Sequence, residues 1–277
     1  MSQSVLLIAF PATDGEALPW WHVADGSVQA WGCDPDPVMA SQAYGPDQAK
    51  GDVKVIALVP SHLTTVIGHE PISDVTRGQA LTAAILAAKA QSLEGDKVHI
   101  VATIDSVGEP VTASVGRDIL SSGLVHLKAL DIDPDAIIPA GWLLPVTEDG
   151  AVSADFGFDH VVRAENIIAT DDPALRDILF ADRTVRPIAG DAFNTMMAGA
   201  WDKSDLNFRA GPFAKKTQRA MDARQKRRLG WMVAALVLLS LAIPLAQLAQ
   251  YHWAAGKADD AALASAVPVV GEMEDPD

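Results

Sequence analysis

The tripeptide Asp155-Phe156-Gly157 is the first place where residue types and spacing could do chemistry. An Asp-x-Gly turn can hold Mg²⁺ or a phosphate, as in protein kinases and actin-like ATPases, but the glycine-rich, lysine and catalytic motifs of a kinase are missing. An actin-like nucleotide site needs a second such turn after the first strand, yet residues 5–15 read VLLIAFPATDG, with Pro11 at the bend. We therefore interpret the tripeptide as a hairpin turn between strands at 152–156 and 160–164, and keep a nucleotide site as the alternative.

No other motif predicts catalysis or cofactor binding. A Walker loop, a Rossmann fingerprint and a Gly-x-Ser-x-Gly elbow are all missing, and His69-Glu70 runs into Pro71, which cannot lie inside a metal-binding helix. The single cysteine, Cys33, excludes an intrachain disulfide and a cysteine-rich zinc site. The seven histidines are scattered along the chain. We therefore assign no catalytic residue, no metal ligand and no cofactor, and expect a protein that is not an enzyme.

Charge divides the 277 residues into three blocks. Residues 214–228 carry seven basic residues and one acidic residue, a net charge of +6, and residues 229–277 carry −5. Of the total of −15, residues 1–213 therefore account for −16. An acidic surface of this kind disfavours nucleic acid as a partner, because phosphate binding depends on Lys and Arg.

An apolar run from Leu229 to Leu248 predicts a transmembrane helix, within a segment 229–250. Twenty helical residues rise about 30 Å, the thickness of the hydrocarbon core, and no charge follows until Lys257. The basic block immediately before the run predicts that the N-terminal part is cytoplasmic, and it can also contact lipid headgroups. Its basic residues are Lys215, Lys216, Arg219, Arg224, Lys226, Arg227 and Arg228.

The residues before this run predict an α/β domain, because short apolar runs alternate with helical patterns. We expect helices at 75–93, 115–124 and 173–179, with Asp74 as the N-cap of the first and Leu81, Ile85, Leu86 and Leu93 on its apolar face. A hairpin is expected at Asp25-Gly26. The domain is expected to end at residue 181, followed by a linker and basic segment (182–228) and, after the span, a short acidic tail (251–277). Strands are expected at 4–10, 20–24, 27–31, 53–59, 64–68, 99–104, 136–138, 152–156 and 160–164.

Four stretches, in this order, resemble one known family. They are VKVIALVP at 53–60, DIDPDAIIPAGWLLP at 131–145, DHVVR at 159–163 and LNFRAGPF at 206–213. In the last stretch Asn207, Gly211 and Phe213 match the family signature that precedes the membrane. The family is the inner-membrane platform protein L of the bacterial type II secretion system.

The resemblance implies an actin-like, ribonuclease H-like cytoplasmic domain followed by one transmembrane helix in the bacterial inner membrane. It implies a scaffold that recruits the cytoplasmic secretion ATPase (protein E), with platform proteins M and F as further partners, a possible homodimer, and a shortened periplasmic part. Asn207, Gly211, Phe213 and the seven basic residues are the candidate interaction or positioning residues. Two alternatives stay open: a membrane-anchored, actin-like nucleotide-binding regulator and a bitopic signalling receptor.

Overall fold

The structure is a computed structural model that describes residues 4–11, 16–41, 53–105, 107–147, 150–165, 167–203, 205–215 and 250–262, with a few separate residues between 231 and 248. The chain divides into two units, Met1–Lys215 and Lys216–Asp277. In the second unit, residues 251–262 are helical. Within the described part of the chain, no helix combines the length and the apolar character that a membrane crossing requires. Most of the expected span at 229–250 lies outside the described residues.

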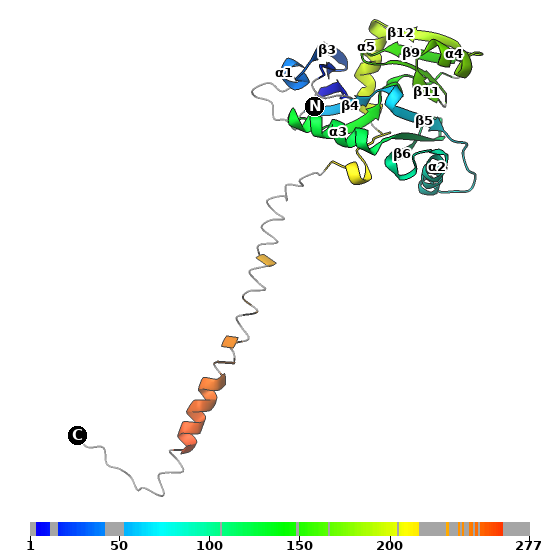
Figure 1. Cartoon of the computed structure of the whole chain (residues 1–277). Helices are drawn as coiled ribbons and strands as arrows, with labels where there is room; N and C mark the ends of the chain where they lie inside the picture. The colour runs from blue at the N-terminus through cyan, green and yellow to red at the C-terminus, as the bar shows by residue number, and fades with distance from the viewer. Residues whose placement is uncertain are drawn as a thin grey trace, which may run out of the picture. The chain divides into compact units, whose positions relative to one another are not determined.

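The first unit contains a five-stranded sheet, called here sheet A (Figure 1). Its order is β3-β2-β1-β4-β8, in which β1, β2 and β3 form an antiparallel meander and β4 and β8 run parallel to β1. The strands are β1 (Ser4–Ala9), β2 (Leu18–Ala24), β3 (Ser27–Asp34), β4 (Val53–Val59) and β8 (Ala136–Pro139). The expected hairpin at Asp25-Gly26 is confirmed, and both residues have the positive φ, 53° and 73°, that such a tight turn needs.

A second sheet, sheet B, has seven strands in the order β12-β9-β10-β11-β5-β7-β6. The set β9 to β12 repeats the arrangement of β1 to β4: three antiparallel strands, then a fourth parallel to the first and preceded by a helix. The strands are β5 (Thr64–Gly68), β6 (Val98–Ile104), β7 (Pro110–Gly116), β9 (Gly150–Asp155), β10 (His160–Ala164), β11 (Ile167–Thr170) and β12 (Thr184–Ile188). The nine expected strands are confirmed, whereas β7, β11 and β12 were not expected.

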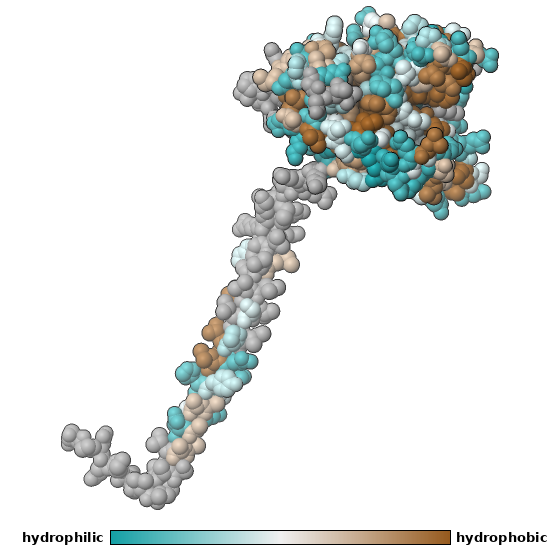
Figure 2. All heavy atoms as spheres, in the orientation of Figure 1, coloured by the Kyte–Doolittle hydropathy of each residue, from teal (hydrophilic) through white to brown (hydrophobic). Residues whose placement is uncertain are grey.

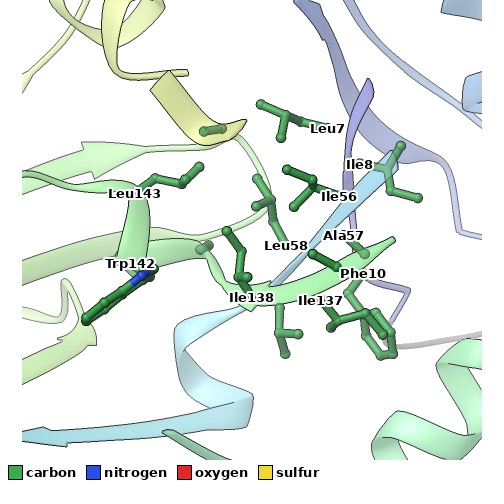
Figure 3. Close-up of a cluster of buried hydrophobic side chains, with 14 of the residues drawn as sticks. Leu7, Ile8, Phe10, Ile56, Ala57, Leu58, Ile137, Ile138, Trp142 and Leu143 are labelled. Carbon is green, nitrogen blue, oxygen red and sulfur yellow. The ribbon is translucent and has the colours of Figure 1, made fainter. Parts of the chain in front are cut away.

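Buried aliphatic side chains of β1, β4 and β8 form the centre of the core (Figure 3). Leu7, Leu58 and Ile138 are fully buried. Strands that bury both faces read as continuous apolar runs, as β1, β4 and β8 do. Trp142 and Leu143 join the same cluster from a short 3₁₀ turn, η3 (Ala140–Leu143).

Helix α2 differs from its expected form in two respects. Its N-cap is Thr76, which forms a capping box with Gln79, so the prediction of Asp74 was wrong. The helix packs on β6 and β7 through Ala84 and Ala88, while Leu86 is 62% exposed. Small alanines allow close approach to the sheet, Leu86 is left at the surface, and Leu81 and Ile85 are half-buried. The helices are α1 (Pro37–Ser41), α2 (Arg77–Gln91), α3 (Arg117–Ala129), α4 (Pro173–Leu179) and α5 (Asp191–Ala198).

The compact unit continues to Lys215, past the expected domain end at residue 181. Strand β12 pairs with β9, and α5 packs on β2 and β3. Leu206 and Phe208 are fully buried. Residues 182–215 are therefore part of the folded domain, and the expectation that they form a linker is corrected. The scattered Pro and Gly residues of this stretch suggested a loop, although a few of its apolar side chains are buried in the domain.

Candidate functional site

Residues 205–215, which we call the closing segment, end the folded domain at Lys215, the first basic residue of the basic block. Asn207 lies beside β8, the edge strand of sheet A. Its side-chain oxygen accepts hydrogen bonds from the amides of Ile137 (2.9 Å) and Arg209 (2.8 Å), and the amide of Phe208 donates to the Ile137 carbonyl oxygen (2.8 Å). The segment thus satisfies backbone groups that an edge strand would otherwise leave open.

The closing segment also contacts sheet B. The Phe208 carbonyl oxygen lies 3.0 Å from Nε2 of His99, a buried residue of β6. The ring of Phe213 meets the His99 ring edge-on, with centroids 4.9 Å apart. Burial lowers the pKa of His99, so the neutral ring, donating from Nε2, is the form that fits. The segment therefore joins the edge of one sheet to the edge strand of the other.

Asp205 is the first residue of the closing segment, and its carboxylate accepts hydrogen bonds from two other elements of the domain. One carboxylate oxygen accepts from the Thr103 hydroxyl (3.1 Å), and the other accepts from the Trp142 indole nitrogen (3.1 Å). Thr103 belongs to β6 and Trp142 to η3, so this carboxylate fixes the start of the segment to both.

Arg163, the last residue of the DHVVR stretch, supports the same region from β10. Its guanidinium donates to the Trp142 and Leu144 carbonyl oxygens (both 2.8 Å) and lies over the Trp142 ring, 4.3 Å from the centroid. Burial lowers the pKa of Arg163 to about 10, and the nearby Asp105 and Asp205 carboxylates oppose this shift. The side chain remains a cation at neutral pH, so its role here is to hold η3.

Salt bridges fix the far end of the closing segment. Arg209 pairs with Asp133 (2.6 Å), and Lys215 pairs with Asp135 (2.7 Å). The other oxygen of Asp135 accepts from the amide of Val55 in β4 (2.9 Å). Two of the four resemblance stretches, 131–145 and 206–213, are thus brought into contact, and the first residue of the basic block is bound to the domain.

The structure places the predicted site residues in two groups. Asn207 and Phe213 make the inward contacts above, and Gly211, with φ of 55°, makes the turn η5 (Gly211–Phe213). Asn207, Phe213 and Lys215 thus contact the rest of the domain, and Gly211 shapes the turn at the end of the closing segment. The other six basic residues, Lys216, Arg219, Arg224, Lys226, Arg227 and Arg228, lie outside the described residues.

The Asp155 turn is a hairpin, as preferred from the sequence. The Asp155 carboxylate accepts from the amide of Gly157 (2.7 Å), which has φ of 80°. Phe156 and Phe158 of this turn pack against Trp21 of β2, with ring centroids 6.4 Å from it, and Phe193 of α5 joins the same cluster. Aromatic rings therefore fill the space between this hairpin and β2.

Sequence reasoning missed a buried polar contact at Asp159. Its carboxylate accepts from the amide (2.5 Å) and the hydroxyl (2.9 Å) of Ser61, whose hydroxyl also lies 2.9 Å from that of Thr170. Burial raises the pKa of Asp159, and the bonds from Ser61 oppose the shift. The residue stands in an ordinary hairpin sequence, so only its burial distinguishes it. In the part of the chain that the structure describes, no group of three or more His, Cys, Asp or Glu residues could hold a metal ion.

Comparisons with known proteins define the fold. No protein-family model and no curated protein matches the sequence. Among solved structures, the chain is similar to the cytoplasmic domain of EpsL, an inner-membrane component of the type II secretion system of Vibrio cholerae, with 16% identity and a TM-score of 0.56, covering 76% of this chain and 100% of that chain. A protein of unknown function with an actin-like ATPase fold, from Bacteroides thetaiotaomicron, superposes less closely, with 8% identity and a TM-score of 0.35, covering 74% and 89%.

The folded part of this chain is therefore an α/β domain that contains two related sheet units. Its fold is that of the EpsL cytoplasmic domain.

Proposed function

We propose that this protein is a non-catalytic scaffold of the type II secretion inner-membrane platform, which recruits the cytoplasmic secretion ATPase to the membrane. The likeness to the EpsL cytoplasmic domain, which is covered over its whole length, is the observation that carries the proposal. The family resemblance of the sequence points the same way, and its signature stretch forms the closing segment.

The repeated strand arrangement supports an actin-like fold within this proposal. The meander-plus-parallel-strand unit occurs twice, as β1 to β4 and as β9 to β12. An actin-like ATPase would bind its nucleotide between two such units. In this chain the rings of Trp21, Phe156 and Phe158 pack together between β2 and the Asp155 hairpin, which favours the scaffold over a nucleotide-binding regulator.

The closing segment fixes the C-terminal end of the folded domain. Because Leu206, Phe208 and Lys215 are held by both sheets and by the loop before β8, the domain is fixed as far as Lys215, the first basic residue of the block. The basic block and the predicted span would then place the domain at the inner membrane. Tethering raises the effective concentration of a bound ATPase there, which needs no chemistry in the tether.

Calorimetric titration of the full chain in lipid nanodiscs with the same organism's secretion ATPase tests the proposal, with MgATP titrated into the chain alone as the control. We expect binding to the ATPase, weakening as salt rises if the −16 of residues 1–213 steers the encounter. Binding of MgATP without binding of the ATPase would reject the scaffold and favour the regulator.

A further inference from the structure

A groove of about 450 Å³ lies between the end of α2 and the beginning of α3, away from the closing segment and the Asp155 turn. Its floor is formed by neighbouring pairs of β5 and β7, Thr65 beside Ser114 and Ile67 beside Thr112. Ile119 of α3 lines one side. Three of these four floor side chains carry a hydroxyl group, and Ile67 is aliphatic.

Exposed apolar and acidic side chains lie on the rim of the groove. Leu93 is fully exposed at the end of α2, and Figure 2 shows further hydrophobic surface over this helix, where Leu86 is 62% exposed. Glu94 and Asp118 are exposed on the rim, and neither carboxylate forms an ion pair with another described residue. Aliphatic side chains in the groove and on its rim, between two unpaired carboxylates, fit a ligand that is both apolar and cationic.

The strand pairing in sheet B limits the backbone form that a peptide ligand can take in this groove. Strand β5 is paired on both sides, with β11 and β7, and β7 is paired with β5 and β6. The floor of the groove therefore offers no open strand edge to an extended peptide. Recognition must come through side chains, as when an amphipathic helix lies in a groove.

We propose that this groove binds a basic amphipathic helix of the secretion ATPase. An apolar side chain of that helix enters the groove against Ile67 and Leu93. Lysine or arginine residues one turn away, at spacings of three or four residues, pair with Glu94 and Asp118. The −16 of residues 1–213 attracts such a helix before contact. This inference rests on the proposed function and specifies where the ATPase docks.

Two variants of the full chain in nanodiscs test it, by calorimetry against the same ATPase at low and at physiological salt. Thr65→Trp fills the groove from an exposed strand position, and the pair Glu94→Gln and Asp118→Asn removes the rim charges. The matched control, Glu165→Gln with Asp177→Asn, removes two exposed carboxylates that do not line the groove. Circular dichroism melting identifies any variant that fails to fold.

We expect each groove variant to weaken binding by about tenfold or more at low salt, which corresponds to about 1.4 kcal/mol. The loss in the charge variant shrinks as salt rises, and the control pair binds within about twofold of the unaltered chain. Unaltered binding by both folded groove variants, or an equal loss in the control pair, overturns the inference and leaves the scaffold function intact. Absence of binding by the unaltered chain overturns both.

Discussion

Nε2 of His99 lies 3.0 Å from the carbonyl oxygen of Phe208, a residue 109 positions further along the chain. This contact joins β6 of sheet B to the segment that completes the edge of sheet A. A family signature expected to lie in a linker is thus a packed part of the domain.

We expect the stability contributed by His99 to depend on pH. Burial, the largest cause, lowers the pKa of His99, and the charge of Arg117 adds to this, while the bond to Phe208 opposes it. A lowered pKa in the folded state means that the contribution is complete above the unfolded pKa of about 6.5 and is lost as pH falls through the folded pKa. Thermal unfolding of the chain from pH 7.5 to pH 5 measures this loss.

The variant His99→Gln is the control, because an amide can donate to Phe208 without titrating. His22 and His69, whose pKa values burial also lowers, remain in both proteins and cancel in the difference. The stability advantage of the unaltered chain over His99→Gln should shrink as pH falls. A difference that is constant with pH would contradict the role given to His99.

Asn207→Ala should destabilise the domain by about 1–3 kcal/mol, because the amides of Ile137 and Arg209 lose their acceptor. Asn207→Asp keeps an acceptor oxygen and should cost clearly less. Urea unfolding of the two variants at neutral pH gives the comparison. Equal losses in the two variants would contradict the acceptor role of the Asn207 oxygen, because aspartate keeps both the size of the side chain and an acceptor oxygen.

Gly211→Ala should cost about 1–2 kcal/mol, since φ at this residue is 55° and an added Cβ would meet no atom within 4 Å. The cost is therefore conformational. Gly199→Ala is matched to it, because its surroundings are equally open while its φ is −80°. Thermal melts should show a loss for Gly211→Ala only, and a similar loss in both variants would reject this explanation.

A chain ending at residue 202 should melt well below one ending at residue 215. The shorter chain lacks Leu206 and Phe208, both fully buried, each of which contributes roughly 1.5–3 kcal/mol by burial. For a domain of this size, the combined loss corresponds to a shift of roughly 10 °C. Circular dichroism melts of the two chains test this, and coincident melting temperatures would show that the closing segment adds nothing.

Phe156→Ala should destabilise the domain by about 3–5 kcal/mol without creating a nucleotide site, because the ring packs among Trp21, Phe158 and Phe193. Asp155→Ala, at an exposed turn position of the same hairpin, should cost much less. Urea unfolding measures the two losses, and calorimetry with MgATP measures nucleotide binding. Micromolar MgATP binding that is lost in Asp155→Ala would favour the regulator.

The sequence by itself determined the elements whose pattern is local. Val53–Val59 reads as a continuous apolar run because both its faces are buried, and Asp25-Gly26 accepts the positive φ of a tight turn. Such patterns depend only on neighbouring residues, so they can be recognised without knowledge of the rest of the chain. The order of four short stretches also sufficed to indicate the family resemblance.

Only the tertiary structure decided the role of the closing segment and of α2. Asn207 and Phe208 find their partners 70 and 109 residues away, and no local period marks such contacts. In α2, alanines face the sheet and Leu86 faces solvent, because close packing on β6 and β7 favours small side chains. Hydrophobicity along a sequence states which residues can be buried, and the space left between packed elements decides which of them are.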